Sequence, residues 1–312
     1  MNVSDSTSTP IRFDNQVAIV TGAGGGLGRS HALQLAARGA KVVVNDLGVA
    51  RDGSGSTQSA AEKVVEEIRA AGGQAIASGA SVTDPAAVEQ MVAQAMGEWG
   101  RVDILVNNAG FLRDKSFSKM SLDDFRAIVD VHLMGAVYCT KAVWEIMKQQ
   151  NYGRIVMTTS SSGLFGNFGQ ANYGAAKMAL VGLMQTLAIE GEKYGIRVNC
   201  LAPTAATRMT EELMGADALA LLTPESVTPG MLWLVSKDAP SKTVLCAGAG
   251  TFSRSNITLT DGIHVGERAD AAEVLAASAG RLADRSGEII PVAGFQQGQM
   301  EVTKAAAAKS GG

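Results

Sequence analysis

Residues 16–39 read QVAIVTGAGGGLGRSHALQLAARG, and their order decides the fold. The apolar run at 16–21 predicts a buried strand, and residues 26–39 predict a helix that Gly39 ends. Between them stands Thr21-Gly22-Ala23-Gly24-Gly25-Gly26-Leu27-Gly28. Glycines let the backbone turn tightly toward a diphosphate, and a helix N-terminus adds N–H donors and a positive dipole. We therefore expect a nucleotide site here rather than an ordinary structural turn.

The alternation of apolar and amphipathic stretches continues along the chain. Further strands are predicted at 41–46, 74–79, 102–108, 153–160, 195–203 and 243–250. Helices are predicted between them: over 60–73, from Asp84 as N-cap with Pro85 first, over about 122–149, and from about Asn172. Because the apolar runs are continuous, we expect strands buried on both faces. The pattern predicts an α/β fold, a doubly wound parallel sheet of the Rossmann type in a single domain with a C-terminal extension.

Three segments make up the predicted organisation of the chain. Residues 1–12 are polar and read as an N-terminal tail, and residues 13–261 hold the Rossmann-fold domain. Residues 262–312 form a C-terminal extension with one helix and one further strand, packed on the domain or on a neighbouring subunit. The final AAAAKSGG, residues 305–312, is expected to be frayed and flexible.

Composition excludes several classes of protein. With 46% hydrophobic residues and 18% charged residues, the 312-residue chain is expected to be globular. The net charge is −3 and Lys and Arg are scattered singly, so we expect no nucleic acid partner. No signal peptide, membrane span or metal-binding cluster of His, Cys and carboxylates is apparent. Cys139, Cys200 and Cys246 are far apart, which favours a reducing compartment, and cytoplasm is the expected location.

The second predicted strand ends in Asn45-Asp46, roughly twenty residues after the glycines. A carboxylate at this point accepts hydrogen bonds from ribose hydroxyls and repels a 2′-phosphate. Asp46 therefore favours NAD over NADP, although it could instead be a loop cap. Arg51, in the following loop, could pair with a phosphate and favour the other cofactor.

Residues 158–177 read TTSSSGLFGNFGQANYGAAK and carry the candidate catalytic groups. Tyr173 and Lys177 are four residues apart, which places them on one face of a helix. A free tyrosine titrates near 10, and a nearby ammonium lowers that pKa toward a range useful for a base. Ser160, at a strand end, can donate a hydrogen bond to a substrate oxygen as charge develops. The alternative is that these side chains only shape a turn and a helix start.

Taken together, these motifs resemble the short-chain dehydrogenase/reductase family over about residues 13–250. The TGxxxGxG motif, Asn107-Asn108-Ala109-Gly110 and Ser160…Tyr173-x-x-x-Lys177 stand in that family's order. VVVNDLG, FLRDKSFSKMS, VHLMG and GNFGQANY are similar to one branch, the (3R)-hydroxyacyl-CoA dehydrogenase units of peroxisomal multifunctional enzymes of type 2. The chain lacks the hydratase and sterol-carrier domains of those enzymes, so we expect a stand-alone, bacterial-like form.

The resemblance implies a set of cofactor contacts. Gly22, Gly26 and Leu27 would approach the diphosphate, and Asp46 the adenosine ribose. The remaining implied contacts are Ser81 and Val82 at the adenine, Asn108, Ala109 and Gly110 behind the nicotinamide half, and Tyr173, Lys177 and Pro203 beside the nicotinamide riboside. Two positions depart from the family pattern: Ser81 replaces the usual Asp, and Pro203-Thr204 replaces the usual Pro-Gly.

The resemblance also implies a catalytic set of Ser160, Tyr173, Lys177 and His132. Many family members have Asn where His132 stands, in a helix whose kink exposes a main-chain carbonyl. That carbonyl holds a water that links the lysine to solvent, and a His could keep this backbone contact. The alternative is a packed helix histidine with no part in the reaction.

Several functions remain open at this point. The first is an NAD-dependent oxidation of a (3R)-3-hydroxyacyl-CoA to the 3-oxoacyl-CoA, and the second is a hydroxysteroid or steroid side-chain CoA dehydrogenase. A catalytically silent NAD-binding scaffold is the alternative from another class. Apolar residues near the expected pocket mouth suit an acyl or a steroid substrate, or only pack the core: Phe111, Leu164, Phe165, Phe168 and Met209. A homo-oligomer, dimer or tetramer, is expected because members of this family usually pair their long helices between subunits.

Overall fold

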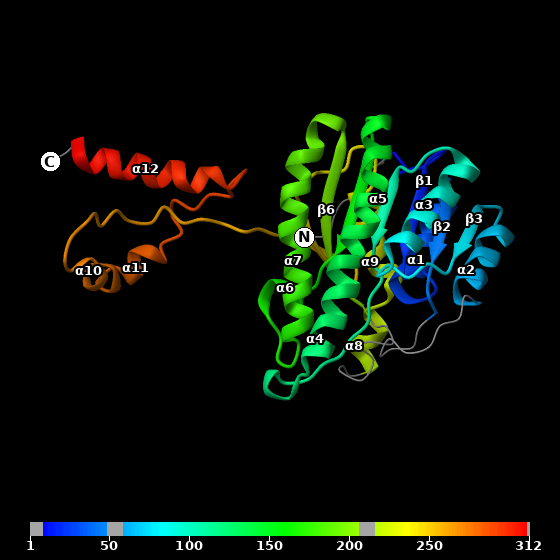
Figure 1. The fold of residues 1–312 in the computed structure, drawn as a ribbon, viewed down its shortest axis with the longest axis horizontal. Helices are drawn as coiled ribbons and strands as arrows, with labels where there is room; N and C mark the ends of the chain where they lie inside the picture. Colours follow the sequence, from blue (N-terminus) through cyan, green and yellow to red (C-terminus); the bar gives the residue numbers. More distant parts are fainter. Residues whose placement is uncertain (1–8, 49–58, 206–215, 311–312) are drawn as a thin grey trace. The chain divides into compact units, whose positions relative to one another are not determined.

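A computed structural model describes residues 9–48, 59–205 and 216–310 of the chain. By their internal contacts they form two compact units, residues 1–254 and 255–312. The first unit is built on an eight-stranded sheet (Figure 1) with the order β3-β2-β1-β4-β5-β6-β7-β8. The strands are β1 (Val17–Thr21), β2 (Lys41–Asn45), β3 (Gln74–Ser78), β4 (Ile104–Asn107), β5 (Gly153–Thr158), β6 (Ile196–Thr204), β7 (Val244–Gly248) and β8 (Thr251–Ser255).

The strands from β3 to β7 pair in parallel, and the order reverses between β1 and β4. Such a reversal leaves a crevice at the carboxyl ends of the two strands, where ligands bind in open α/β sheets. The predicted Rossmann-type fold is therefore confirmed. β8 at the sheet edge was not predicted, because its sequence TFSRS carries no apolar run.

Helices cover both faces of the sheet. They are α1 (Gly26–Ala37), α2 (Ser59–Ala70), α3 (Pro85–Trp99), α4 (Leu122–Val129), α5 (Gly135–Gln150), α6 (Ser161–Phe165), α7 (Ala171–Gly191), α8 (Ala216–Leu221) and α9 (Pro224–Leu234), with short turns η1 (Phe117–Lys119) and η3 (Glu192–Tyr194). α1, α2 and α9 pack on one face, and α3, α5 and α7 on the other. Asp84 caps α3 as predicted, since its carboxylate accepts hydrogen bonds from the N–H groups of Ala86 and Ala87.

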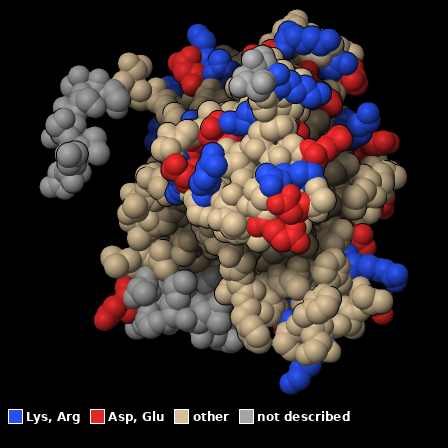
Figure 2. Space-filling model, turned by 90° about the vertical axis from the view of Figure 1, so that its left-hand side faces the viewer, with Lys and Arg blue, Asp and Glu red and all other residues tan. Residues whose placement is uncertain are grey.

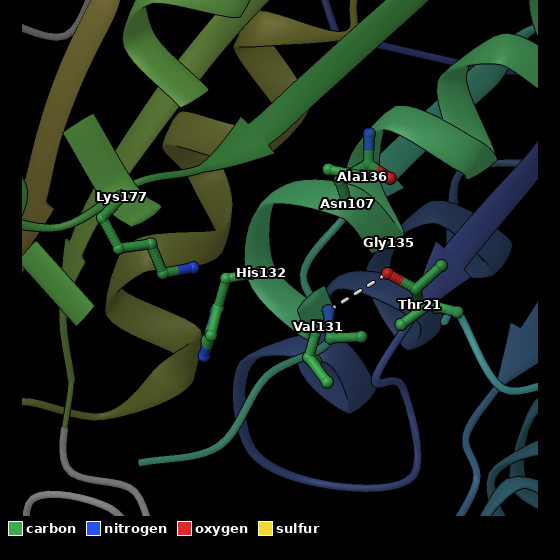
Figure 3. A pocket seen from close by; sticks show the side chains of 9 residues that line it. Thr21, Asn107, Val131, His132, Gly135, Ala136 and Lys177 are labelled. Atoms are coloured by element: carbon green, nitrogen blue, oxygen red, sulfur yellow. Dashed lines mark hydrogen bonds between the residues drawn. The ribbon is translucent and has the colours of Figure 1, made fainter. Parts of the chain in front are cut away.

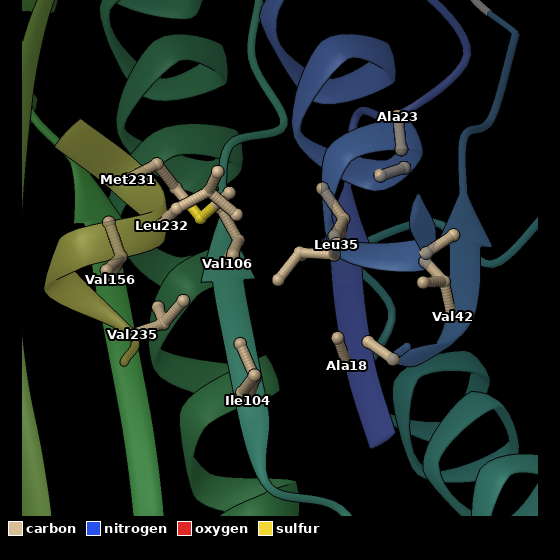
Figure 4. Close-up of a cluster of buried hydrophobic side chains, with 14 of the residues drawn as sticks. Ala18, Ala23, Leu35, Val42, Ile104, Val106, Val156, Met231, Leu232 and Val235 are labelled. Atoms are coloured by element: carbon tan, nitrogen blue, oxygen red, sulfur yellow. The ribbon is translucent and has the colours of Figure 1, made fainter. Parts of the chain in front are cut away.

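Successive residues of one strand enter different cores, which explains the continuous apolar runs. Ala18 and Val20 of β1 belong to the cluster beneath α1 and α9, shown in Figure 4. Val17 and Ile19 belong to the cluster beneath α3, α5 and α7. All five residues of β1 are buried. The sheet is thus held between two apolar layers, as the sequence predicts.

The long helix predicted at 122–149 is present but irregular. α4 and α5 are joined without a break by η2 (Asp130–Met134), which is a turn of π-helix. Such turns widen a helix by one residue and occur frequently at functional sites. His132 lies in the middle of this turn.

The second unit contains α10 (Ala271–Ala277), α11 (Ala279–Leu282), α12 (Phe295–Ser310) and a bridge between Leu259 and Ile289. Where the sequence predicts one helix and one strand, the structure has three helices. Residues 305–310, expected to be frayed, continue α12. Among residues 256–309 no side chain is buried, so this unit has no hydrophobic core of its own.

Surface charge is mixed in sign. On the face shown in Figure 2, Lys and Arg are interspersed with Asp and Glu, and the described residues drawn there form no continuous basic stripe. None of the described helices is long and apolar enough to cross a membrane.

Candidate active site

The glycine loop lies between β1 and α1 at the reversal of strand order. Gly22 and Gly26 have φ values of 64° and 50°, a region that glycine adopts without strain. A Cβ on Gly28 would lie 2.1 Å from the Gly22 carbonyl oxygen, so the loop folds back closely on the helix. The N-cap is Gly25, and no described side chain caps α1. The first N–H groups of the helix are therefore available to an anionic group.

The ends of β1 and β4 are joined by hydrogen bonds behind this loop. The Thr21 hydroxyl accepts from the N–H groups of Asn108 and Ala109, at 3.0 and 3.1 Å. The Asn108 amide donates to the carbonyls of Thr21 and Gly22, at 3.0 and 3.1 Å. Figure 3 shows Thr21 meeting this segment. Sequence reasoning did not single out Thr21; its signal is a hydroxyl at the last position of a buried strand.

Asp46 follows the end of β2 and is held in place by backbone donors. Gly24 N–H donates to one carboxylate oxygen at 2.7 Å, and Gly48 N–H donates to the other at 2.6 Å. The carboxylate thus lies directly against the glycine loop. Arg51, which could favour the other cofactor, lies outside the described residues.

The other implied cofactor residues lie at the ends of β3 and β6. The Ser81 hydroxyl hydrogen-bonds the Thr83 hydroxyl at 2.8 Å, and Val82 is buried against Gly135, where a Cβ would lie 2.7 Å from Val82 Cγ2. Pro203 is half-buried near the end of β6. Met209 lies outside the described residues.

Ser160, Tyr173 and Lys177 meet at the carboxyl end of β5. Ser160 is the N-cap of α6 and its hydroxyl accepts from Ser162 N–H at 3.2 Å. Lys177 is 3% exposed; its Nζ donates to the Thr158 carbonyl at 2.6 Å and lies 5.5 Å from the centre of the Tyr173 ring. Ser161 and Ser162 begin the short helix α6.

Burial sets the protonation of the tyrosine–lysine pair. Burial lowers the pKa of Lys177 to about 7, because a desolvated ammonium is unfavourable. Burial raises the pKa of Tyr173, a hydrogen bond with Ser160 lowers it, and the charge of Asp114 raises it. The net direction is upward, so the phenol is neutral at neutral pH in the protein alone.

His132 is buried between the backbone of Phe111 and the Tyr173 ring. Its Nε2 lies 2.8 Å from the Phe111 carbonyl oxygen and 3.3 Å from the Phe111 amide nitrogen. One nitrogen cannot donate and accept at once, and the shorter contact favours Nε2–H donating to the carbonyl. Burial, followed by the charge of Lys177, holds the pKa of His132 well below its ordinary value. The ring is therefore neutral.

A small cavity lies beside these residues (Figure 3). Its volume is about 10 Å³, and Asn107, His132 and Lys177 are among its lining residues. This is about the space that one water molecule needs. The Asn107 Oδ1 and His132 Nδ1 atoms are buried and have no hydrogen-bond partner among the described residues.

The apolar residues expected at the pocket mouth divide into two groups. Phe111 is buried in a cluster with Ile128 and Ala176, and Leu164 packs against the main core. Phe165 and Phe168 are 72% and 90% exposed. Of the four residues that the structure describes, only Phe165 and Phe168 are exposed, whereas Phe111 and Leu164 pack against other apolar side chains.

Comparison with known proteins gives consistent results. The family model for short chain dehydrogenases matches residues 16–217. Mouse peroxisomal multifunctional enzyme type 2 is 50% identical over 262 residues, which are 84% of this chain and 35% of that protein. The Saccharomyces cerevisiae peroxisomal hydratase-dehydrogenase-epimerase is 50% identical over 245 residues, 78% of this chain and 27% of that protein. The chain thus spans about a third or less of these two relatives.

One solved structure of similar fold contains a cofactor and a substrate-like ligand. It is a 7α-hydroxysteroid dehydrogenase complexed with NADH and 7-oxo glycochenodeoxycholic acid. Its TM-score is 0.68 at 30% sequence identity, over 77% of this chain and 95% of that one.

Proposed function

The chain belongs to the short-chain dehydrogenase family, and from that premise we propose that it is an NAD-dependent (3R)-3-hydroxyacyl-CoA dehydrogenase. It would oxidise the 3-hydroxyl to a 3-oxo group. The observation that carries the proposal is the meeting of Ser160, Tyr173 and Lys177 beside a glycine loop at one edge of the sheet. Such an arrangement offers a base and a hydrogen-bond donor beside a dinucleotide site.

The residues at the glycine loop fit a nicotinamide dinucleotide. The uncapped N-terminus of α1 suits a diphosphate, which Gly22, Gly26 and Leu27 would hold. Asp46 is fixed by two backbone donors, and each carboxylate oxygen keeps a lone pair for a ribose hydroxyl. A 2′-phosphate at that position would meet this negative charge, which supports NAD over NADP. The NADH in the hydroxysteroid dehydrogenase structure is consistent with this choice.

Tyr173 is the proposed base for the substrate hydroxyl. When bound, NAD would supply the hydride acceptor, and the positive charge of its nicotinamide would favour the phenolate form of Tyr173. Lys177 stands close to the ring of Tyr173 and adds to this effect when protonated. Ser160 donates to the substrate oxygen. The cavity beside His132, Asn107 and Lys177 has room for one water that could carry a proton away from Lys177.

Two observations bear on the substrate. The name of the yeast relative includes a dehydrogenase activity beside hydratase and epimerase activities, which supports a hydroxyacyl substrate. The hydroxysteroid dehydrogenase structure and the exposed Phe165 and Phe168 support the second candidate, a steroid alcohol. A silent NAD-binding scaffold would not need the buried Lys177 against Tyr173.

The second unit bears on the oligomeric state. We propose a homo-oligomer, because the second unit has no core of its own and its apolar side chains need a covering surface. The division at about residue 261 and the cytoplasmic location stay predictions from the sequence.

NADH formation from NAD tests the proposal. The substrates are (3R)-3-hydroxyacyl-CoAs of increasing chain length, their (3S) epimers, and free hydroxysteroids. We expect oxidation of the (3R) thioesters, little of the (3S) forms, and none in Tyr173→Phe, which should still bind NADH. Preference for free steroids would favour the second candidate, and no oxidation of any alcohol would favour the scaffold.

A further inference from the structure

Asp114 joins the two loops that frame the proposed catalytic residues. It lies between β4 and η1, and its carboxylate accepts a hydrogen bond from the Gln170 amide at 2.7 Å. The Gln170 amide oxygen in turn accepts from the Ser162 hydroxyl at 2.7 Å. Gln170 stands three residues before Tyr173, and Ser162 stands two residues after Ser160. This chain of hydrogen bonds links the Asp114 carboxylate to the two segments that carry the catalytic side chains.

The backbone holds the same loops together. Lys115 N–H donates to the Gly169 carbonyl at 2.9 Å, and the buried Asn172 amide donates to the Arg113 carbonyl at 3.1 Å. Residues on both sides of Asp114 are therefore fixed to the segment that leads into α7. Because the backbone is hydrogen-bonded on both sides of Asp114, the Asp114 carboxylate cannot move far from the mouth of the site.

The charge of Asp114 is not paired with a cation among the described residues. Arg113 and Lys115 flank it in sequence, but both contact Asp124, at 3.3 and 3.0 Å. The hydrogen bond to Asp114 comes instead from a neutral amide. Asp114 is exposed, and its charge reaches Tyr173, where it opposes ionisation of the phenol. The mouth of the site therefore carries a fixed negative charge.

We propose that Asp114 is a specificity-determining residue that admits substrates whose acyl carbonyl, two bonds from the reacting alcohol carbon, carries no charge, and that rejects free 3-hydroxy acids. The inference rests on the proposed function and deepens it. In a 3-hydroxy acid the carboxylate is two bonds from the alcohol carbon, so binding the alcohol at Tyr173 brings two negative charges near each other. A thioester removes that charge. Asp114 thus acts by repulsion, which is a common device for excluding a close analogue.

The experiment compares three forms of one substrate. They are the free (3R)-3-hydroxy acid, its methyl ester and its CoA thioester, at the chain length oxidised fastest as the thioester. The wild type should oxidise both esters and discriminate against the acid. Asp114→Asn keeps the acceptor for Gln170 and removes the charge. We expect it to raise kcat/KM for the acid about tenfold, with a change of less than about threefold for both esters.

Two controls separate charge at the site from other effects. Asp123→Asn removes an equally negative side chain from α4 that is 91% exposed and pairs with Arg126 at 3.8 Å. It should leave the ratio of acid to ester unchanged. Added salt should raise the wild-type rate with the acid, because salt screens exposed charges, and should have little such effect in Asp114→Asn.

The outcomes distinguish this inference from the proposed function. If Asp114→Asn raised kcat/KM equally for all three substrates, the cause would be easier ionisation of the Tyr173 phenol. The proposed discrimination by charge would then be overturned. A wild type that oxidises acid and methyl ester equally well would also overturn it. No oxidation of the CoA thioester would instead overturn the proposed function, and the acid and methyl ester would still decide the role of Asp114.

Discussion

The His132 ring meets the Tyr173 ring edge-on, at 87° and with 5.2 Å between their centres. The same imidazole donates to the Phe111 carbonyl at 2.8 Å. One buried side chain from the π-turn thus contacts both the proposed base and the start of the loop that carries Asp114. The family resemblance implies a role for the backbone at this position, whereas these contacts lead us to propose that the side chain orients Tyr173.

Replacing His132 tests which part of the residue matters. His132→Leu keeps an apolar body but loses the donor to Phe111 and the edge contact with Tyr173. We expect kcat to fall roughly 10- to 100-fold with a smaller change in KM, because small displacements of a base cost rate. The pH dependence of kcat should also shift. A wild-type kcat and pH profile in His132→Leu would mean that only the main-chain carbonyl takes part.

Gly110 is the residue that leaves room for this imidazole. A Cβ at Gly110 would lie 2.0 Å from His132 Cε1 and 2.6 Å from Nδ1. Gly110→Ala should therefore lower the free energy of unfolding by about 1–3 kcal/mol and reduce kcat like His132→Leu. Adding His132→Ala should recover the stability lost to the clash. Urea unfolding measures both.

A matched glycine serves as the control for that substitution. Gly97 lies in α3, and a Cβ there meets no heavy atom within 4 Å among the described residues. Gly97→Ala should raise the free energy of unfolding by about 0.5–1 kcal/mol, the ordinary gain in a helix. If Gly110→Ala were as stable as Gly97→Ala, the packing of His132 against Gly110 would be refuted.

Asp46 should control the choice of cofactor. Asp46→Asn keeps one acceptor, for either the Gly24 or the Gly48 N–H, and removes the charge that would face a 2′-phosphate. We expect the ratio of kcat/KM for NAD to that for NADP to fall at least about tenfold. Steady-state kinetics with both cofactors measures this ratio. An unchanged ratio would indicate that residues elsewhere select the cofactor.

Lys177 should make stability depend on pH. Its pKa of about 7 in the folded protein lies below the ordinary lysine value of 10.5, so above pH 7 the unfolded chain holds a proton that the folded chain releases. Because the unfolded state binds more protons, the free energy of unfolding should rise with pH, by at most about 1.4 kcal/mol per unit. Urea unfolding between pH 7 and 8.5 measures the slope.

The measurement ends at pH 8.5 because titration of the buried cysteines affects the slope at higher pH. Burial raises the pKa of Cys139 to about 12, so at higher pH the unfolded thiol loses its proton first and offsets the rise. Lys177→Met should flatten the rise between pH 7 and 8.5. Lys148→Met, at a half-buried lysine paired with Glu145, should keep it. A rise that persists in Lys177→Met would assign it to another group.

Much of the first unit could be predicted because its signals are local. The run at β1 and the glycines before α1 are close in sequence, and Asp84 caps the helix that it precedes. The contacts that complete the site are not local. Gln170 reaches Asp114 across 56 positions, and the space at Gly110 is set by a ring 22 positions away. A sequence pattern shows which residue types are present, but it does not show which residues contact one another. Those contacts arise from tertiary packing rather than from periodicity.

The C-terminal segment was hardest to predict for a related reason. Its three helices bury no described side chain, so no strong apolar periodicity marks them. Residues 305–310 are mostly alanine and continue α12 through helix propensity rather than packing.

The turn of π-helix at residues 130–134 affects both the candidate site and the stability of the helix that contains it. It holds one residue more than a regular helical turn, and each residue of an α-helix advances about 100° around the axis. Deleting one residue there would restore regular hydrogen bonding between α4 and α5 while turning one helix relative to the other. A shortened chain could then be more stable and yet present a different side chain to Tyr173. We therefore expect stability and activity to respond oppositely to a single deletion at this turn.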